Sequence, residues 1–207
     1  GAPGGIGMAC ARALGAAGYS LAITSTTGRI EARRAELIAE GYEVTAHQGD
    51  LSDPVAVSRL YDEVGAIDVL VNNAGMGSVL APAEQLSFLE TSPDQWRRAM
   101  DASLTTAVLV TQAFLPAMVR RRQGRVIMMS SVTGHLVSNP RESAYSAAKS
   151  ALVGLTHALA LEVAAQGVTV NAVAPGWTAT EAATPEEQRA ARATPPRRAG
   201  RPDEVAA

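Results

Sequence analysis

The sequence predicts an α/β fold in which helices cover both faces of a parallel β-sheet. Two observations support this prediction. Short apolar segments alternate along the 207 residues with longer segments whose apolar residues recur every three or four positions. The short segments are apolar at consecutive positions, as strands are when both faces of their sheet are buried. The sequence shows no internal repeat, low-complexity tract or linker, so we expect residues 1–207 to form a single domain.

The first half of the chain is expected to form three helices and three strands. Gly18 and Gly41 are expected to end the first two helices, because glycine favours the left-handed backbone that often follows a helix. Asp53 and Pro54 suit the N-cap and the first turn of the third helix. The expected helices cover residues 8–17, 30–40 and 54–64, and the expected strands cover residues 19–24, 43–47 and 67–72.

The second half is expected to contain two long helices and two strands. Ser92 and Gln95 form a capping box for the first helix, which runs to Arg122 and which Pro116 is expected to kink. The second helix is expected over residues 143–166, and the strands over residues 126–129 and 168–173.

Composition narrows the classes of partner. Hydrophobic residues make up 47% of the chain and the net charge is -2, so nothing indicates a nucleic-acid partner. No apolar run approaches membrane-spanning length, and we expect no membrane partner and no metal site. Cys10 is the only cysteine and cannot form an internal disulfide, which favours a reducing, cytoplasmic setting.

Tyr145 and Lys149 stand four residues apart in the second long helix. At this spacing a phenol and an ammonium project from the same face and can act on one bound molecule. Lys149 is also the only lysine in the chain. A Tyr and a Lys on a solvated helix surface are the alternative interpretation.

Glycines at positions 1, 5 and 7 precede the first expected helix. Such a turn lets the backbone approach a pyrophosphate, whose charge is then met by the amides at the helix N-terminus. A simple loop remains the alternative.

These features occur in a characteristic order. The glycine turn is followed by Asn72-Asn73-Ala74-Gly75 at the end of a strand, then by Ser131, by Tyr145 with Lys149, and by Pro175-Gly176. Together they resemble the classical type of the short-chain dehydrogenase/reductase family, including its 3-oxoacyl-[acyl-carrier-protein] reductase-like members. The resemblance implies a Rossmann-type doubly wound sheet. It also implies an NAD(P)(H)-dependent oxidoreductase that moves a hydride between nicotinamide and a carbonyl or secondary alcohol.

The resemblance assigns roles to four side chains. Tyr145 would be the acid/base; a phenol has a pKa of about 10, so the charge of Lys149 would be needed to stabilise the phenolate. Ser131 would polarise the substrate oxygen, with Ser130 as the competing assignment. Ser103 stands where the family usually carries an asparagine of the proton relay, so it would either hold a water or leave the relay less efficient. A dinucleotide-binding protein without catalysis is the remaining alternative.

The resemblance also implies a set of cofactor contacts. They are Gly1, Gly5, Ile6, Gly7, Ser25, Asp50, Leu51, Asn73, Ala74, Gly75, Tyr145, Lys149, Pro175, Gly176, Thr178 and Thr180. For Asp50, a plain turn residue is the alternative. Residues 24–29 at the end of the second strand contain no carboxylate and include Arg29, which favours NADP(H) over NAD(H). Gly4 favours NAD(H) instead, because many NADP-dependent relatives carry an arginine at this position of the glycine turn.

The resemblance implies a small-molecule substrate with a carbonyl or alcohol group and does not identify it. Several apolar residues would give either a partly apolar pocket or ordinary loop packing: Leu80, Leu86, Phe88, Leu89 and Trp177. Arg120 to Arg122 resemble a patch that binds an acyl carrier protein, with a solvated helix end as the alternative.

The family commonly forms tetramers, so a homotetramer or homodimer is expected. An apolar stripe on the second long helix could serve that contact or face the sheet: Leu152, Leu155, Leu159 and Val163. A glycine turn of this kind normally follows a strand, and the chain stops at what resembles a helix start. We therefore expect the first strand and the C-terminal strand of the domain to lie outside these residues.

Overall fold

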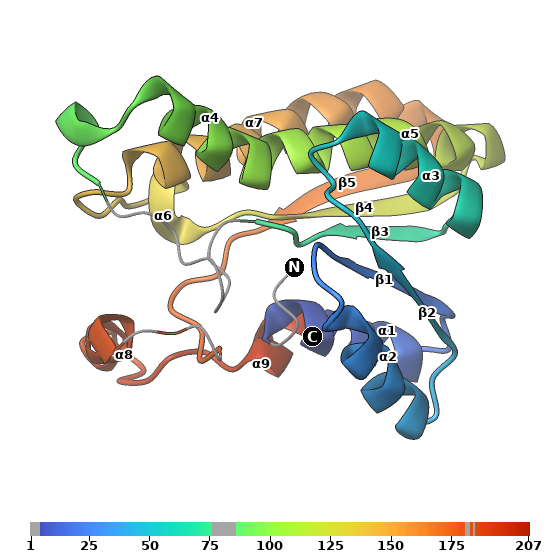
Figure 1. Cartoon of the computed structure of the whole chain (residues 1–207), viewed down its shortest axis with the longest axis horizontal. Helices are drawn as coiled ribbons and strands as arrows, with labels where there is room; N and C mark the ends of the chain where they lie inside the picture. Colours follow the sequence, from blue (N-terminus) through green and yellow to red (C-terminus); the bar gives the residue numbers. More distant parts are fainter. Residues whose placement is uncertain (1–4, 76–85, 181–182, 184) are drawn as a thin grey trace. The chain divides into compact units, whose positions relative to one another are not determined.

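The computed structural model describes residues 5–75, 86–180, 183 and 185–207 (Figure 1). Its contacts divide the chain into two compact units. Unit 1 comprises residues 1–49, 77–82 and 175–207, and unit 2 comprises residues 50–76 and 83–174. Each unit contains its own parallel sheet.

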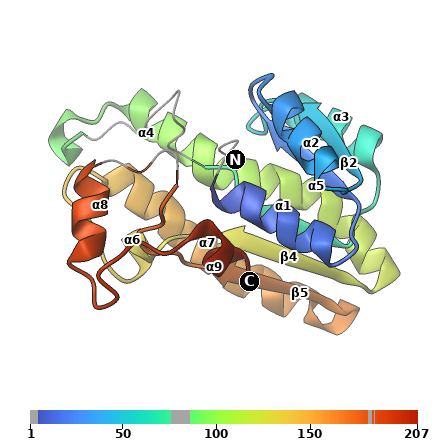
Figure 2. The same ribbon diagram turned by 90° about the horizontal axis from the view of Figure 1, so that it is seen from below.

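Unit 1 is built on two paired strands. They are β1 (Leu21–Ser25) and β2 (Val44–Gln48), with Leu21 opposite Val44. The helices of this unit are α1 (Ile6–Ala16), α2 (Ile30–Ala39), α8 (Pro185–Arg192) and α9 (Pro202–Ala206). The small core joins α1, α2 and both strands, and its buried members are Met8, Ala11, Leu21, Leu37 and Val44. In Figure 2, α1 is seen from below beside α9, which it contacts.

Unit 2 contains three parallel strands in the order β3–β4–β5. They are β3 (Val69–Asn72), β4 (Gly124–Met129) and β5 (Val168–Val173). Asn72 lies opposite Met128, and Met129 lies opposite Val173. All three strands therefore end at the same edge of the sheet, where ligand sites of parallel sheets are found.

The helical elements of unit 2 are α3 (Pro54–Val64), η1 (Phe88–Glu90), α4 (Pro93–Met100), η2 (Asp101–Thr105), α5 (Thr106–Arg121), α6 (Val132–His135), α7 (Ser143–Val163) and η3 (Ala164–Gln166). Helices α3, α5 and α7 lie along one face of the sheet (Figure 1). Their side chains form the main core with β4 and β5. The completely buried side chains of this core include Met118, Val126, Met128 and Leu152.

The apolar stripe on α7 belongs to this core. Leu152 and Val163 are buried in it, and Leu155 and Leu159 pack against it. The stripe therefore faces the unit's own core, which was one of the two roles expected for it.

Local capping signals confirm several predicted helix boundaries. Asp53 caps α3, because its side chain accepts a bond of 2.9 Å from the backbone N–H of Val55. Ser92 and Gln95 form the expected capping box of α4. Gly18 and Gly41 follow their helices with φ values of 90° and 93°, in the left-handed region that glycine tolerates.

The long helix differs from its prediction. Its hydrogen-bond pattern changes at Asp101–Thr105, a turn of π-helix, whereas Pro116 stays inside α5. A π turn inserts one residue into the helical repeat and is frequently found at functional sites.

Two helical stretches of the described residues are long and apolar enough to cross a membrane, Pro93–Arg121 and Ser143–Gln166. Passing this test of length and composition does not contradict the expectation, which concerned uninterrupted apolar runs. This is a weak indication of a membrane, since core helices of soluble proteins pass the same test. Both stretches place side chains in the core of unit 2, among them Phe114 from α5 and Leu152 from α7.

Candidate active site

The edge of the sheet where β3 ends is held by a buried amide. Asn72 donates its side-chain N–H to Thr111 Oγ1 at 2.9 Å and to Met128 Sδ at 3.2 Å. These contacts tie the end of β3 to α5 and to β4. Asn73, Ala74 and Gly75 follow directly, so their backbone starts from a fixed position.

Lys149 is a buried amine at this edge. Its side chain is 5% exposed, and its Nζ donates a hydrogen bond of 2.8 Å to the carbonyl of Met129 at the end of β4. The same Nζ lies 5.7 Å from the centre of the Tyr145 ring. Burial lowers the pKa of Lys149 from 10.5 to about 8, because the charged form loses solvation. Lys149 therefore remains largely protonated at neutral pH and titrates just above it.

Ser130 and Ser131 follow β4 and have different partners. The Ser130 hydroxyl donates to the backbone carbonyl of Lys149 at 2.7 Å, which uses its proton to fix α7. The Ser131 hydroxyl accepts from the backbone N–H of Thr133 at 3.1 Å and caps α6. Because Ser131 accepts that bond, its own proton is left to donate. This difference favours Ser131 over Ser130 as a donor to a substrate oxygen.

The loop that carries Ser131 rests on the first turns of α7. Gly134 has a φ of 96°, and a Cβ at this position would lie 2.1 Å from the carbonyl oxygen of Ser146. The Ser138 and Ser146 hydroxyls lie 2.7 Å apart. Only glycine allows the backbone at position 134 to approach the Ser146 carbonyl so closely. Gly134 therefore brings the loop against Ser146, the residue that follows Tyr145.

Ser103 and Gly75 lie close to the same amine. Ser103 is completely buried within η2. A Cβ on Gly75 would be 3.3 Å from Lys149 Nζ and 3.8 Å from Ser103 Oγ. The structure therefore gathers the predicted residues Gly75, Ser103 and Lys149, with Tyr145 one helical turn from Lys149.

Unit 1 carries the glycine turn. Gly5 has a φ of 81° and immediately precedes α1, and a Cβ on it would lie 2.9 Å from Thr180 Cγ2. Ile6 and Gly7 form the first turn of this helix. A glycine turn in front of an eleven-residue helix fits a pyrophosphate, because free backbone N–H groups point out of the helix N-terminus. Gly1 and Gly4 lie outside the described residues.

The other expected cofactor contacts in unit 1 have local partners. Ser25 is buried and its Oγ accepts from the backbone N–H of Thr27 at 3.3 Å. Thr178 donates its hydroxyl to the carbonyl of Gly176, the residue after Pro175, at 3.1 Å. Both hydroxyls thus shape their own loops.

Asp50 and Leu51 begin unit 2. The Asp50 side chain is exposed and accepts from the N–H and the hydroxyl of Ser52, at 2.9 and 2.7 Å. Leu51 packs against the main core. Asp50 therefore makes the contacts of a turn residue, which was its alternative interpretation.

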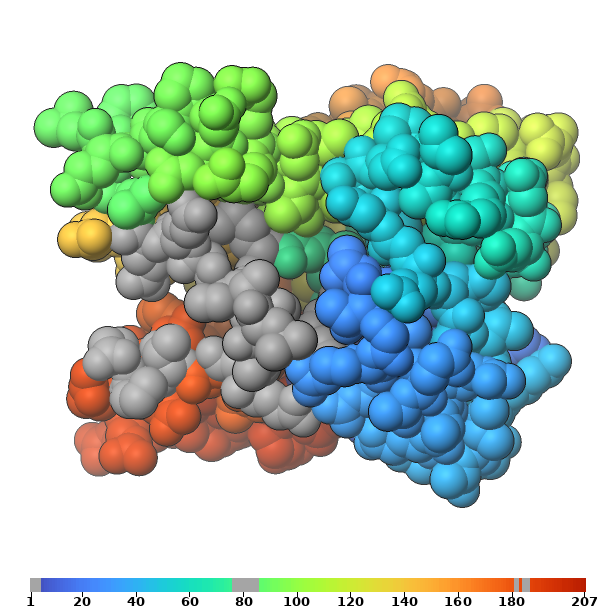
Figure 3. Space-filling view, viewed as in Figure 1, coloured from blue at the N-terminus to red at the C-terminus, as the bar shows by residue number. Residues whose placement is uncertain are grey.

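The expected substrate-facing residues are only partly described. Leu80 lies outside the described residues. Phe88 packs edge-to-face on Trp96 at 6.3 Å between ring centres, and it remains 67% exposed. Leu89 is 95% exposed on the same short helix, which lies with α4 at the surface of unit 2 (green in Figure 3).

The basic residues at the end of α5 bind the chain itself. Arg121 donates to the carbonyl of Ile67 and lies 3.3 Å from Asp68. Arg122 donates to the carbonyl of Ala165 at 2.8 Å. Two of the three arginines thus connect α5 to neighbouring segments.

Sequence reasoning missed two parts of the site. The carbonyl of Met129 is a backbone group, which no residue type reveals. Gly134 had a usable signal, since a glycine three positions after a predicted catalytic serine suggests a backbone turn that needs a positive φ.

Comparisons with known proteins identify the family of the chain. Residues 1–191 match the family model for short chain dehydrogenases. The chain is 38% identical over 221 residues to oxidoreductase UcpA of Escherichia coli strain K12, covering 99% of this chain and 82% of that protein. It is 38% identical over 187 residues to a 3-oxoacyl-[acyl-carrier-protein] reductase of Synechocystis sp., covering 87% of this chain and 73% of that protein.

A solved structure extends the comparison to the fold. The crystal structure of a 3-oxoacyl-[acyl-carrier protein] reductase with bound NAD from Brucella melitensis is 35% identical, with a TM-score of 0.89. The match covers 100% of this chain and 79% of that chain, and it confirms the predicted Rossmann-type α/β fold. The chain belongs to the short chain dehydrogenase family and is an NAD(P)-dependent oxidoreductase that acts on CH–OH groups.

Proposed function

We propose that Tyr145 is the acid/base of this enzyme and that Lys149 controls its charge state. The observation that carries the proposal is the buried Lys149 amine, 5.7 Å from the Tyr145 ring centre and with a pKa of about 8. A protonated amine beside a phenol stabilises the phenolate, and a neutral amine does not. Tyr145 can then exchange a proton with the substrate oxygen near neutral pH.

Ser131 and Ser103 complete the proposed catalytic set. Ser131 would donate its hydroxyl proton to the substrate oxygen, which polarises the carbonyl. In the reductive direction Tyr145 would give its phenolic proton to that oxygen while the carbon receives the hydride. Ser103, buried near Gly75 and Lys149, would take the position of the relay asparagine with one hydroxyl instead of an amide.

The cofactor, when bound, supplies or accepts the hydride. The pyrophosphate would be held by Gly1, Gly5, Ile6 and Gly7 at the start of α1. The remaining expected contacts are Ser25, Asp50, Leu51, Asn73, Ala74, Gly75, Tyr145, Lys149, Pro175, Gly176, Thr178 and Thr180. A single family model over residues 1–191 supports one NAD(P)-binding domain.

We propose that NADP(H) is preferred over NAD(H). Residues 24–29 provide no carboxylate to repel a ribose phosphate, and the exposed Arg29 could bind one. Since one solved relative has NAD bound, both cofactors need to be compared. Arg29→Ala should weaken NADPH binding and leave NADH binding unchanged. Equal losses for the two cofactors would contradict the preference.

A carrier-protein-linked 3-ketoacyl substrate is a second candidate, favoured by the names of relatives. The contacts of Arg121 and Arg122 with the chain's own carbonyls leave Arg120 as the remaining arginine of that patch. The test measures the turnover of carrier-linked and of free ketoesters by the parent protein and by Arg120→Glu. A selective loss with the carrier-linked ester supports this candidate, and equal rates exclude it.

A cytoplasmic homotetramer or homodimer is also proposed. The lone cysteine supports the location. Leu161, 83% exposed on α7, would be covered by an assembly contact. Light scattering of the purified protein measures the assembly.

The test of the catalytic proposal is Tyr145→Phe, assayed with a panel of ketones and alcohols and both nicotinamides. Turnover should fall about a hundredfold or more, because the proton donor is lost while the ring remains. Cofactor affinity should stay near that of the parent protein. Tyr19→Phe, a substitution at a tyrosine of unit 1 that is 42% exposed, is the matched control. Unchanged turnover by Tyr145→Phe would reject the assignment.

A further inference from the structure

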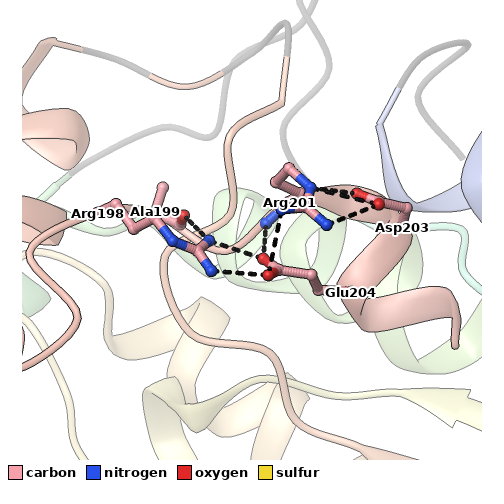
Figure 4. A network of polar contacts seen from close by, with 5 residues as sticks. All are labelled: Arg198, Ala199, Arg201, Asp203 and Glu204. Atoms are coloured by element: carbon pink, nitrogen blue, oxygen red, sulfur yellow. Dashed lines mark hydrogen bonds and ion pairs between the residues drawn. The ribbon is translucent and has the colours of Figure 1, made fainter.

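Glu204 is the centre of a charged network in unit 1 (Figure 4). Its two carboxylate oxygens accept from the two terminal nitrogens of Arg198, each at 2.7 Å. The backbone N–H of Arg201 donates to the same carboxylate at 2.7 Å, and the Arg201 side chain binds Asp203 at 3.0 Å. A bidentate arginine contact is directional, so the carboxylate fixes both ends of the turn from residue 198 to residue 204.

This network lies at the surface. The Glu204 side chain is 34% exposed, and those of Arg198 and Arg201 are 54% and 60% exposed. Exposed ion pairs contribute little to global stability because water screens them. The main effect expected from Glu204 is therefore local, on the conformation of its own turn.

The turn carries Gly200, which pairs with another segment of the chain. The N–H of Gly200 donates to the carbonyl of Trp177, and its carbonyl accepts from the N–H of Ala179, both at 2.8 Å. These two bonds form an isolated parallel bridge between Gly200 and Thr178. The backbone of residues 177–179 is therefore positioned by the turn that Glu204 holds.

The same segment reaches the glycine turn. Thr180 packs so closely on Gly5 that a Cβ on Gly5 would be 2.9 Å from the threonine methyl group. Helix α9, which begins at Pro202, contacts α1, which begins at Ile6. Within unit 1, the network, residues 177–180 and the start of α1 thus form one connected structure.

We propose that Glu204 is a positioning residue for cofactor binding. It holds Gly200, and through Gly200 it holds the segment from Trp177 to Thr180 in the conformation that binds the nicotinamide cofactor. The inference rests on the proposed function, in which Thr178 and Thr180 contact the cofactor. Releasing the turn lowers the fraction of molecules that can bind, and the apparent Kd rises by the same factor.

The test compares Glu204→Gln with Glu40→Gln in the full chain. Glutamine keeps the shape of Glu204 but loses the charge-assisted pair of bonds to Arg198. Glu40 makes a similar bidentate contact with Arg12 in the same unit, at 2.7 to 3.0 Å, and has no bond to residues 177–180. Calorimetric titration with NADPH and NADH measures the Kd, and urea unfolding measures stability.

We expect Glu204→Gln to raise the Kd about fivefold, which corresponds to about 1 kcal/mol. The KM for the cofactor should rise with it, while kcat at saturating cofactor stays near the parent value. Glu40→Gln should change the Kd by less than about twofold. Because Arg198 acts through Glu204, Arg198→Gln and the double variant should show the same increase as Glu204→Gln, without addition.

Two results would overturn the inference. One is a Glu204→Gln protein that is less stable but has an unchanged Kd, since Glu204 would then be purely structural. The other is an equal rise in Kd for Glu40→Gln, which would mean general destabilisation. The catalytic proposal fails separately, through an active Tyr145→Phe protein, and that result would leave the effect of Glu204 on the Kd standing.

Discussion

Replacing Gly75 by alanine tests whether the buried Lys149 amine sets the pH range of the reaction. The added methyl carbon would lie 3.3 Å from Lys149 Nζ and 3.8 Å from Ser103 Oγ. Gly75 is not one of the described glycines with a positive φ, so alanine is compatible with its backbone. In the protein without cofactor, the substitution therefore acts mainly by placing an apolar group against the ammonium.

The size of the effect follows from the pKa of Lys149. Burial lowers it from 10.5 to about 8, and this change disfavours the ammonium by about 3 kcal/mol. A methyl group at this distance excludes water from one side of the amine. We expect a further decrease of about half to one pH unit, or about 1 kcal/mol.

The assay uses the fact that Lys149 is the only lysine. Protein labelled with carbon-13 at the lysine ε position gives one lysine signal, and its shift against pH gives the pKa directly. The alkaline limb of kcat/KM in the free enzyme should follow the same value, because the proposed mechanism requires the protonated amine. Both should lie near pH 8 in the parent protein and both should move down in Gly75→Ala.

Gly154→Ala is the control, because nothing lies within 4 Å of the Cβ it would add. It should leave the lysine signal and the rate profile unchanged. A parent Lys149 that titrates near its ordinary value of 10.5 would refute the reasoning. So would an alkaline limb that moves in Gly75→Ala while the lysine signal does not.

Two further predictions follow from the same region. The folded pKa of Lys149, about 8, lies below its ordinary value of 10.5, so the unfolded chain binds more protons between these values and the free energy of unfolding rises with pH across that window. In Lys149→Met the increase in the free energy of unfolding over this window should be smaller by up to about 3 kcal/mol. Urea unfolding at several pH values measures it. An identical increase in both proteins would contradict the burial penalty. Gly134→Ala should lower kcat/KM at least about tenfold with little change in cofactor Kd, because its Cβ would push the Ser131 loop off Ser146. Full activity would show that the loop position does not matter.

Elements with strong local signals were predicted well from the sequence. Helix α3 spans the predicted residues 54–64, because Asp53 and Pro54 define its start through their own side-chain chemistry. Strand β5 also matches its prediction, residues 168–173. Strand β4 begins two residues earlier than predicted, at Gly124, because its start is set by pairing with Val168 on β5. Pairing partners far apart in sequence are invisible to a local pattern.

The site was predicted as a set of residues but not as a geometry. The family resemblance placed Ser131, Tyr145 and Lys149, and the comparisons confirm the family. Burial of Lys149 and its bond to the Met129 carbonyl depend on how α7 packs against β4. The π turn at residues 101–105 likewise carries no local sequence signal.

The pKa of Lys149 depends on the size of its neighbours as well as on its burial. Gly75 and Ser103 are both small, and the position of the absent Gly75 Cβ lies within contact distance of the amine and of the Ser103 hydroxyl. A larger side chain at position 75 would remove solvation and lower the pKa below about 8. Ser103 in place of the family's asparagine leaves a hydroxyl and a smaller volume beside this space. If Ser103 has the proposed relay role, this departure from the family pattern affects both the relay and the solvation of the lysine, so Ser103→Asn should alter both the rate and the lysine signal.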